Sequence, residues 1–304
     1  MSASADPLAR LLAATPSLLP LAPALARAAA ASAPVLVLGP AGSGRSTLAR
    51  ALHAASPRAR RPLVEVDPGA FPAPLFESEL FGHQPGAFTG AVRAQPGRVA
   101  AAEGGTLLLD PIESLPLNAQ AKLLRLLAER RYAPLGGAER EADVRFLAVG
   151  PDDLGDRLAR GAFRADLYYR LEVLTFRLPA LAERPGDLEP LAAALLADLA
   201  LRLGRGALRL APESLAWMRE YPWPGNVREL RNRLERAVVL GSGEEVAPAR
   251  PAGAGERPRP LAEVEAEALR AALAWTRGHQ GEAARLLGIS RKALWAKRRR
   301  YGLP

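Results

Sequence analysis

The sequence runs Val35-Leu36-Val37-Leu38 directly into Gly39-Pro40-Ala41-Gly42-Ser43-Gly44-Arg45-Ser46. Four apolar residues in a row have the length of a buried parallel strand, and the residues from Thr47 to Ala55 have a helical composition. Strand, glycine-rich loop and helix form the layout of a Walker A loop, in which backbone N–H groups and the helix N-terminus favour an anion. The alternative is an ordinary turn with a helix cap. We predict a nucleotide cradle made by Gly39, Gly42, Ser43, Gly44, Arg45, Ser46 and Thr47.

Three more apolar segments are expected to be strands of the same sheet. They are Pro62–Val66, Gly105–Leu109 and Val144–Val149. Asp110 follows the second of them, at the strand end that should lie beside the phosphate loop. An aspartate at that place suits coordination of magnesium through water, with the Ser46 hydroxyl as the other oxygen. The sequence therefore predicts an α/β domain with a parallel sheet and a nucleotide–magnesium site.

Length and composition allow two or three domains. The chain has 304 residues and no cysteine, which excludes disulfides and thiolate metal sites and fits a reducing, cytoplasmic location. The Leu- and Ala-rich N-terminal region is broken by Pro16, Pro20 and Pro23, so no membrane span is expected there. We expect this region to form the first helix of the nucleotide-binding domain.

The excess positive charge is concentrated at the C-terminus. The net charge is +9, and the segment from Ala283 to Pro304 has no acidic residue. Helices are predicted at Leu261–Thr276, Gly281–Leu287 and Arg291–Arg300, and a short helix, a glycine turn and a basic helix make a helix-turn-helix. The predicted DNA-binding residues are Ser290, Arg291, Lys292, Trp295, Arg298, Arg299 and Arg300. For Trp295 the alternative is packing in a core, and for the arginines it is a solvated helix face.

Several motifs together resemble one family. Glu77–His83, the loop Gly86-Ala87-Phe88-Thr89-Gly90-Ala91 and Gly104–Asp110 resemble the AAA+ ATPase domain of the sigma-54-dependent transcriptional activators, and Ala283–Ser290 resembles a Fis-type helix-turn-helix. The resemblance extends from about Ser17 to the C-terminus. It implies that the loop formed by Gly86, Ala87, Phe88, Thr89, Gly90 and Ala91 contacts the sigma factor. The alternative is a tight turn in which Phe88 folds back into the core.

The resemblance also implies further site residues. Phe163–Leu171 matches the segment that supplies arginine fingers, so Arg164 and Arg170 are expected to reach the nucleotide of a neighbouring subunit. Trp223–Leu230 matches the second sensor of the lid, with Arg228 facing the nucleotide. The alternatives are a solvated helix face for the two fingers, a helix cap for Asn226 and a core position for Trp223.

The family likeness carries expectations about ligands and partners. ATP and Mg²⁺ are the expected cofactors, and sigma-54 RNA polymerase and enhancer DNA are the expected partners. The expected assembly is a homo-oligomeric ring, as a hexamer, or a mixed ring with a paralogue. No membrane contact is expected.

Three positions near the expected γ-phosphate depart from the family pattern. Arg45 replaces a lysine, Pro111 replaces the glutamate that activates water, and Gly150-Pro151 replaces a pair with side-chain donors. Asp67 stands where the family has an asparagine, and we predict that it polarises the water; Glu113, two positions after Pro111, is the other nearby carboxylate. Two functions therefore remain open: a motor that hydrolyses ATP, or a hydrolysis-deficient ATP-binding regulator that serves as a passive ring subunit.

The resulting fold prediction is an AAA+ P-loop parallel sheet flanked by helices, an all-α lid and a C-terminal helix-turn-helix. The predicted boundaries are residues 1–178 for the α/β nucleotide-binding part, 179–242 for the helical lid, 243–260 for a linker and 261–304 for the Fis-type DNA-binding domain. Autonomous ATPase activity is left undecided by the sequence.

Overall fold

The computed structural model describes residues 6–251 and 261–302. The chain divides into two compact units, one ending at Arg250 and one beginning at Pro251. Within the described ranges, no helix combines the length and the apolar character needed to cross a lipid bilayer.

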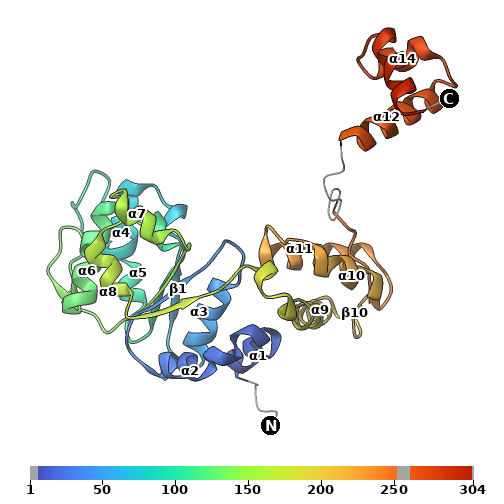
Figure 1. Ribbon diagram of the computed structural model, residues 1–304. Coiled ribbons are helices and arrows are strands. Elements are labelled where there is room, and N and C mark those ends of the chain that lie inside the picture. Colours follow the sequence, from blue (N-terminus) through green and yellow to red (C-terminus); the bar gives the residue numbers. More distant parts are fainter. Residues whose placement is uncertain (1–5, 252–260, 303–304) are drawn as a thin grey trace. The chain divides into compact units, whose positions relative to one another are not determined.

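The first unit is built on a five-stranded parallel sheet with strand order β2-β5-β8-β1-β9 (Figure 1). The strands are β1 (Val35–Leu38), β2 (Leu63–Val66), β5 (Thr106–Leu109), β8 (Arg145–Gly150) and β9 (Leu174–Arg177). Leu38 is in register with Gly150 on one side and Arg177 on the other. This confirms the predicted fold class, while the edge strand β9 was not predicted.

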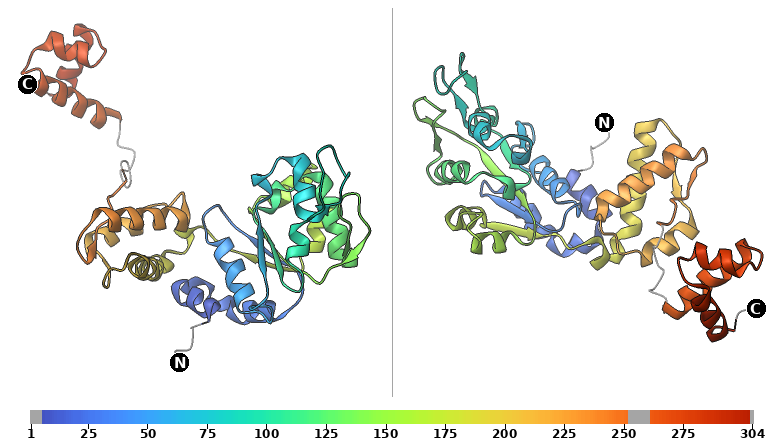
Figure 2. Two further views of the ribbon diagram at one scale, coloured as in Figure 1. Left: turned by 180° about the vertical axis from the view of Figure 1, so that it is seen from behind. Right: turned by 90° about the horizontal axis from the view of Figure 1, so that it is seen from above.

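Helices cover both faces of the sheet (Figures 1 and 2). Side chains alternate along each strand, so Leu36 and Leu38 join one core and Val35 and Val37 join the other. The helices of this part are α1 (Pro7–Ala14), α2 (Ala22–Ala30), α3 (Arg45–Ala54), α4 (Ala73–Phe81), α5 (Arg98–Ala101), α6 (Leu117–Glu129), α7 (Leu154–Ala159) and α8 (Ala165–Leu171), with 3-10 helices η1 (Pro16–Leu21), η2 (Pro68–Ala70) and η3 (Ile112–Ser114).

The N-terminal region differs from the single helix expected from sequence. It forms α1, then the 3-10 helix η1, then α2. Pro16 is the first residue of η1 and Pro20 lies inside it. Because proline has no N–H to donate, a continuous α-helix cannot pass through this stretch.

A helical lid completes the first unit. It contains η4 (Leu181–Glu183), η5 (Pro185–Asp187), α9 (Leu188–Leu203), α10 (Pro212–Glu220) and α11 (Asn226–Leu240), with the short strands β10 (Arg209–Leu210) and β11 (Glu245–Val246). Its core includes Trp223, which is buried and donates from its indole nitrogen to the Met218 carbonyl at 2.9 Å. Trp223 therefore takes the core position that was the alternative reading.

The second unit has its own small core. Helices α12 (Leu261–Trp275), α13 (Gln280–Leu286) and α14 (Arg291–Arg300) pack around Leu269, Ala272, Ala283, Ala284 and Leu294. The three helices lie where the sequence predicted them, and the Ser290 hydroxyl caps α14 by accepting from the Ala293 amide at 3.1 Å.

Arg145 is a charged side chain inside the first unit. It is almost fully buried in β8, and its guanidinium donates to the carbonyls of Ala28 and Ala29 at 2.7 and 3.1 Å. These carbonyls lie at the C-terminal end of α2, where the helix dipole favours a cation. Burial lowers the pKa of Arg145, and the two carbonyls replace the water lost by Nη1 and Nη2.

Acidification is expected to weaken the first unit through His53. His53 is buried, its Nδ1 lies 2.9 Å from the Thr106 hydroxyl, and burial together with the nearby Arg145 lowers its pKa below the ordinary 6.5. The unfolded chain then binds more protons, so the stabilisation is complete above pH 6.5 and is lost as the pH falls below it. Urea unfolding between about pH 7.5 and 5.5 should show this decrease, and a His53→Gln variant should show less of it. Equal slopes for the two proteins would contradict the assignment.

Candidate functional site

The glycine-rich loop connects β1 to α3 at the carboxyl edge of the sheet. Gly39 and Gly42 have positive φ angles of 152° and 77°. A Cβ on Gly42 would lie 2.5 Å from the Gly225 carbonyl oxygen, and one on Gly39 would lie 2.5 Å from that of Leu178. Both glycines are therefore required by close backbone contacts as well as by their conformation.

Arg45 takes the place of the expected lysine at the start of α3. Its Nη1 donates to the Gly39 carbonyl at 2.7 Å and also to the Gly150 carbonyl at the end of β8. A Cβ at position 150 would lie 2.9 Å from Cγ2 of Ile112, so Ile112 fills the space that a side chain would need. The Arg45 side chain thus connects the phosphate loop to the strand end where the family pattern has polar side chains.

Ser46 and Asp110 meet beside this loop. The Ser46 hydroxyl donates to Oδ2 of Asp110, which is the residue following β5. Two oxygen ligands at one point suit a hard cation such as Mg²⁺, which usually takes one or two protein groups and completes its shell with water and phosphate oxygens. Among the described residues there is no group of three or more His, Cys, Asp or Glu side chains able to hold a metal.

Asp67 and Glu113 are the two carboxylates closest to Asp110 by strand register and by sequence, respectively. Asp67 follows β2 beside Asp110, since Val66 pairs with Leu109. Asp67 is exposed, and its Oδ1 accepts from the Gly69 amide at 2.8 Å as the cap of η2. Glu113 lies in η3, and its Oε2 is shielded from water with no hydrogen-bond partner among the described residues.

The environment of Glu113 changes its acidity. Burial raises the pKa of Glu113, Arg45 and Arg157 oppose that rise, and the charge of Asp110 adds to it. The side chain is therefore close enough to both Arg45 and Asp110 to feel their charges.

The lid is attached to the phosphate loop by three hydrogen bonds to loop carbonyls. Arg184 donates to the Ser43 carbonyl, the Asn226 side-chain amide donates to that of Ala41 at 3.0 Å, and the Arg228 amide donates to that of Gly42 at 3.2 Å. Asn226 also accepts from the Leu181 amide at 2.7 Å. Asn226 is therefore a bridge between lid and loop and does not act as the cap of α11, which begins after Gly225.

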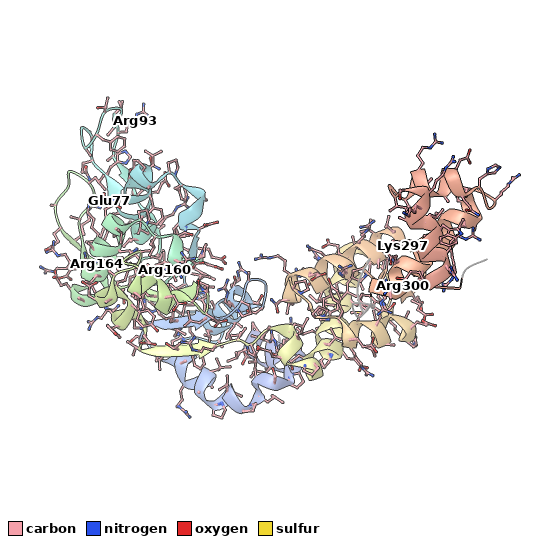
Figure 3. All side chains as sticks on the ribbon, turned by 45° about the horizontal axis from the view of Figure 1, so that its top comes forward. Glu77, Arg93, Arg160, Arg164, Lys297 and Arg300 are labelled. Atoms are coloured by element: carbon pink, nitrogen blue, oxygen red, sulfur yellow. The ribbon has the colours of Figure 1, made fainter. Side chains whose placement is uncertain are left out.

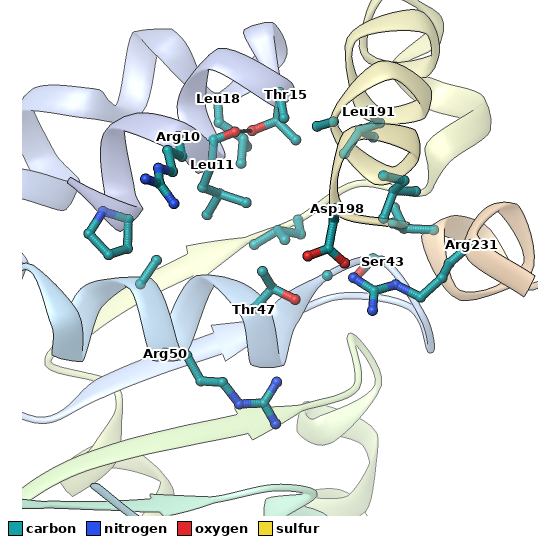
Figure 4. Close-up of a pocket in the computed structure, with 18 of the residues that line it drawn as sticks. Arg10, Leu11, Thr15, Leu18, Ser43, Thr47, Arg50, Leu191, Asp198 and Arg231 are labelled. Carbon is teal, nitrogen blue, oxygen red and sulfur yellow. Dashed lines mark hydrogen bonds between the residues drawn. The ribbon is translucent and has the colours of Figure 1, made fainter. Parts of the chain in front are cut away.

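A cavity of about 460 Å³ opens between α1, α3 and the lid (Figure 4). Its phosphate-loop side is formed by Ser43, Gly44 and Thr47, and its polar lid side by Asp198 and Arg231, which project toward the same opening in Figure 4. The apolar wall includes Leu11, Leu18, Leu178, Leu191 and Leu195. Sequence analysis missed the contribution of α1, because an amphipathic helix without a polar motif gives no sign that it lines a site.

Arg228, predicted as a nucleotide sensor, lies beside the loop but outside this cavity. Its side chain lines a second cavity with Ala41, Pro224 and Glu229. The Arg228 amide contacts the phosphate loop at Gly42, while the Arg228 side chain lines the second cavity. Its role in contacting nucleotide stays a prediction.

The Gly86–Ala91 loop is a tight turn at the edge of the domain. The Gly86 amide donates to the Ala91 carbonyl at 2.8 Å, and the Ala91 amide donates to that of Phe88 at 2.9 Å. The Phe88 ring packs edge-on against His83 with 4.9 Å between ring centroids and is still 38% exposed. Phe88 is thus outside the hydrophobic core and rests on His83. Arg93 follows at the tip of this region in Figure 3.

The basic helix α14 has an exposed face. Its exposed residues include Arg291, Lys292, Trp295, Arg299 and Arg300. The Trp295 side chain is 56% exposed, and its ring centroid lies 5.7 Å from Cζ of Arg299. Arg298 is half-buried, and Lys297 pairs with Glu265 of α12. Figure 3 labels Lys297 and Arg300 on this helix. Trp295 is thus exposed, while the small core receives Leu294.

Three protein families match successive parts of the chain. The sequence pattern of the sigma-54 interaction domain matches residues 11–177. The chain belongs to this sigma-54 activator family. Residues 182–250 match the AAA+ ATPase lid domain, and residues 260–301 match the bacterial regulatory proteins of the Fis family.

Curated relatives of this chain include two regulatory proteins. The chain is 44% identical over 282 residues to the transcriptional regulatory protein ZraR of Klebsiella oxytoca, covering 88% of this chain and 64% of ZraR. It is 43% identical over 286 residues to the alginate biosynthesis transcriptional regulatory protein AlgB of Pseudomonas aeruginosa, covering 90% and 64%. The chain therefore spans less than two thirds of the length of these relatives.

Solved structures of NtrX from Brucella abortus share the fold of this chain. One crystal structure superposes with a TM-score of 0.73 at 30% identity and covers 97% of this chain and 70% of NtrX. Another, in complex with ATP, has a TM-score of 0.71 at 31% identity and covers 94% and 68%.

Arg164 and Arg170, the two predicted arginine fingers, do not line the main cavity. Arg164 precedes α8, is held by a 2.8 Å bond from its amide to Gln120, and pairs with Asp166 at 2.8 Å (Figure 3). That pair raises the pKa of the Arg164 guanidinium. Arg170 is exposed and lines a separate small cavity with Ser32 and Val173. Their action on the nucleotide of a neighbouring subunit stays a prediction.

Proposed function

We propose that this chain is a sigma-54-dependent transcriptional regulator that binds ATP and DNA and remodels sigma-54 RNA polymerase through the Gly86–Ala91 loop. The observation that carries the proposal is the cavity of about 460 Å³ beside the phosphate loop. Its volume suits a small-molecule ligand, and it has an apolar wall for a base and loop amides for phosphates. The ATP complex of NtrX supports the choice of ligand.

The residues present fit a nucleotide with magnesium. The phosphates lie on the amides of the loop Gly39–Gly44, and Arg45 supplies a positive charge next to them. Ser46 and, through water, Asp110 hold Mg²⁺, which neutralises charge on the phosphate oxygens when bound. Arg228 senses the nucleotide from the lid. Asp67, after β2, and Glu113, in η3, are the two carboxylates available to the attacking water.

The active form in this proposal is an oligomeric ring, with a hexamer as the expected size, or a mixed ring with a paralogue, working in the cytoplasm. Arg164 and Arg170 of one subunit stabilise transition-state charge at the nucleotide of the next. The loop then presents Phe88 and Thr89 to sigma-54. The exposed face of α14, with Arg291, Lys292 and Trp295, binds enhancer DNA and keeps the ring near its promoter.

A second function is favoured by Pro111. Proline cannot act as a base, so the chain is alternatively an ATP-binding regulator that lends its arginines to an active neighbour in a mixed ring. Phosphate release by the purified protein, alone and mixed with a family member that has the usual glutamate, separates the two functions. Full turnover alone supports the motor, and turnover only in the mixture supports the passive subunit.

ATP binding is tested most directly at Arg45. Arg45→Ala removes the guanidinium beside the phosphates, so ATP affinity should fall by about 10- to 100-fold, the range of a charged hydrogen bond. Titration with a fluorescent ATP analogue measures this, and Arg60→Ala, an exposed arginine outside the site, is the matched control. Failure of the unaltered chain to take up ATP, even at concentrations that allow assembly, would remove the basis of the proposed function.

A further inference from the structure

Glu113 occupies a fixed place at the carboxyl edge of the sheet. It lies in η3, between Ile112, which is fully buried, and Ser114. The Ser114 amide donates to the Pro111 carbonyl at 3.3 Å and the Leu115 amide to that of Ile112 at 3.2 Å, so the turn is closed by its own backbone. Burial of Ile112 holds the turn against the core, and the Glu113 side chain starts from an anchored backbone.

One oxygen of the Glu113 carboxylate is not used by the fold, although a backbone hydrogen bond from its own residue acts on the carboxylate. Its Oε2 is shielded from water and has no hydrogen-bond partner in the part of the chain that the structure describes. Native proteins rarely leave a buried polar atom without a partner, and a catalytic role is one of the explanations for such an atom. The charges that act on Glu113 are those of Arg45, Arg157 and Asp110, two of which belong to the proposed ATP site.

The unusual residues around Glu113 fit one another. Arg45 reaches the Gly150 carbonyl, and Ile112 occupies the space that a side chain at position 150 would need. Ile112 in turn anchors the turn that carries Glu113. Arg45, Gly150 and Ile112 are thus parts of one packed arrangement, and Glu113 is the residue that follows Ile112 in the chain.

We propose that Glu113 is the carboxylate that accepts the proton of the attacking water during ATP hydrolysis, in the role that Pro111 cannot perform. The inference rests on the proposed function. The water oxygen forms a bond to the γ-phosphorus, the bond from that phosphorus to the β–γ bridging oxygen breaks, and its electron pair leaves with ADP. The proton of the water moves to Glu113, and the products are ADP and inorganic phosphate.

Asp67 is the competing carboxylate, and the structure distinguishes the two. One Asp67 oxygen already accepts from the Gly69 amide, and the side chain is exposed to water. Among the described residues, Oε2 of Glu113 has no hydrogen-bond partner and is shielded from water, and the charges of Arg45 and Asp110 act on the side chain. The shielded Oε2 without a partner favours Glu113 over the exposed, capping Asp67 as the group that accepts the proton.

The test compares Glu113→Gln, Asp67→Ala and the control Glu220→Gln, which makes the same chemical change at an exposed residue of the lid. Phosphate release by Glu113→Gln should fall by about 10²- to 10⁴-fold, with Glu220→Gln unchanged. ATP affinity should be preserved in all three. The affinity for ADP–fluoroaluminate, which imitates the transition state, should fall by about 10-fold in Glu113→Gln alone.

Three results would overturn the inference. They are undiminished phosphate release by Glu113→Gln, a collapse of turnover in Asp67→Ala alone, and ATP uptake without any turnover by the unaltered chain. Absence of ATP uptake by the unaltered chain would instead overturn the proposed function itself, and the binding measurement separates that failure from the others. Thermal unfolding of each variant shows that the comparison is made between folded proteins.

Discussion

Asp187→Ala should lower the free energy of unfolding of the first unit by about 3–5 kcal/mol. The Asp187 and Arg184 side chains are only 1% and 2% exposed, and their charged atoms lie 3.5 Å apart. Asp187 also accepts from the Ser17 amide at 2.8 Å and from its hydroxyl at 2.6 Å, which joins η1 to the lid. Removing the carboxylate leaves a buried guanidinium without its counter-charge and two donors without an acceptor.

Denaturant unfolding of the unaltered chain and of Asp187→Ala measures this difference. The matched control is Glu189→Ala, because Glu189 also pairs with an arginine in the lid but is 64% exposed, and an exposed pair contributes about 0–1 kcal/mol. Because Arg184 also holds the Ser43 carbonyl, ATP affinity should fall in Asp187→Ala and stay constant in Glu189→Ala. Equal destabilisation by the two substitutions would show that the buried pair has no special role.

The central strands could be predicted because each is a short apolar run next to a recognisable turn. Val35–Leu38 is the strand that was predicted, and the other three predicted strands differ from β2, β5 and β8 by a residue at one or both ends. The edge strand β9 was missed, because Leu174–Arg177 is only partly buried and ends in a charged residue. The strand order depends on long-range packing, which local sequence patterns do not contain.

The buried charges were beyond sequence reasoning. Arg145 lies inside β8 where a charged residue would be expected near water, and its position depends on two carbonyls more than 100 residues away in the chain. The Arg184–Asp187 pair depends in the same way on Ser17. Such contacts join segments that are distant in sequence, so no local pattern predicts them.

The candidate site was predicted unevenly for a related reason. The phosphate loop, Ser46 and Asp110 belong to a motif whose spacing fixes their geometry, and the structure brings Ser46 and Asp110 together. The wall supplied by α1 and the shielded oxygen of Glu113 arise from packing between elements. The motif thus locates the phosphate loop, while the fold decides what surrounds that loop.

Arg164→Ala and Arg170→Ala are each expected to reduce ATP turnover by about 10³-fold or more, which is the effect of an arginine finger. Both side chains are exposed and neither lines the cavity of its own subunit, so ATP affinity of the separate chain should not change. Phosphate release at concentrations that allow assembly measures the effect. Arg160→Ala, an exposed arginine close to Arg164 in sequence and labelled beside it in Figure 3, is the control.

A mixture of two inactive variants tests whether these arginines act between subunits. Arg170→Ala keeps Glu113, and Glu113→Gln keeps Arg170, so one type of contact in the mixed ring contains both groups. Turnover should therefore reappear on mixing, to a fraction of that of the unaltered protein, because only contacts with the intact pair are active. If Arg170 acted within its own subunit, by contrast, no subunit in the mixture would contain both Arg170 and Glu113. Turnover would then stay absent. Recovery on mixing thus requires both the finger in trans and the relocated glutamate.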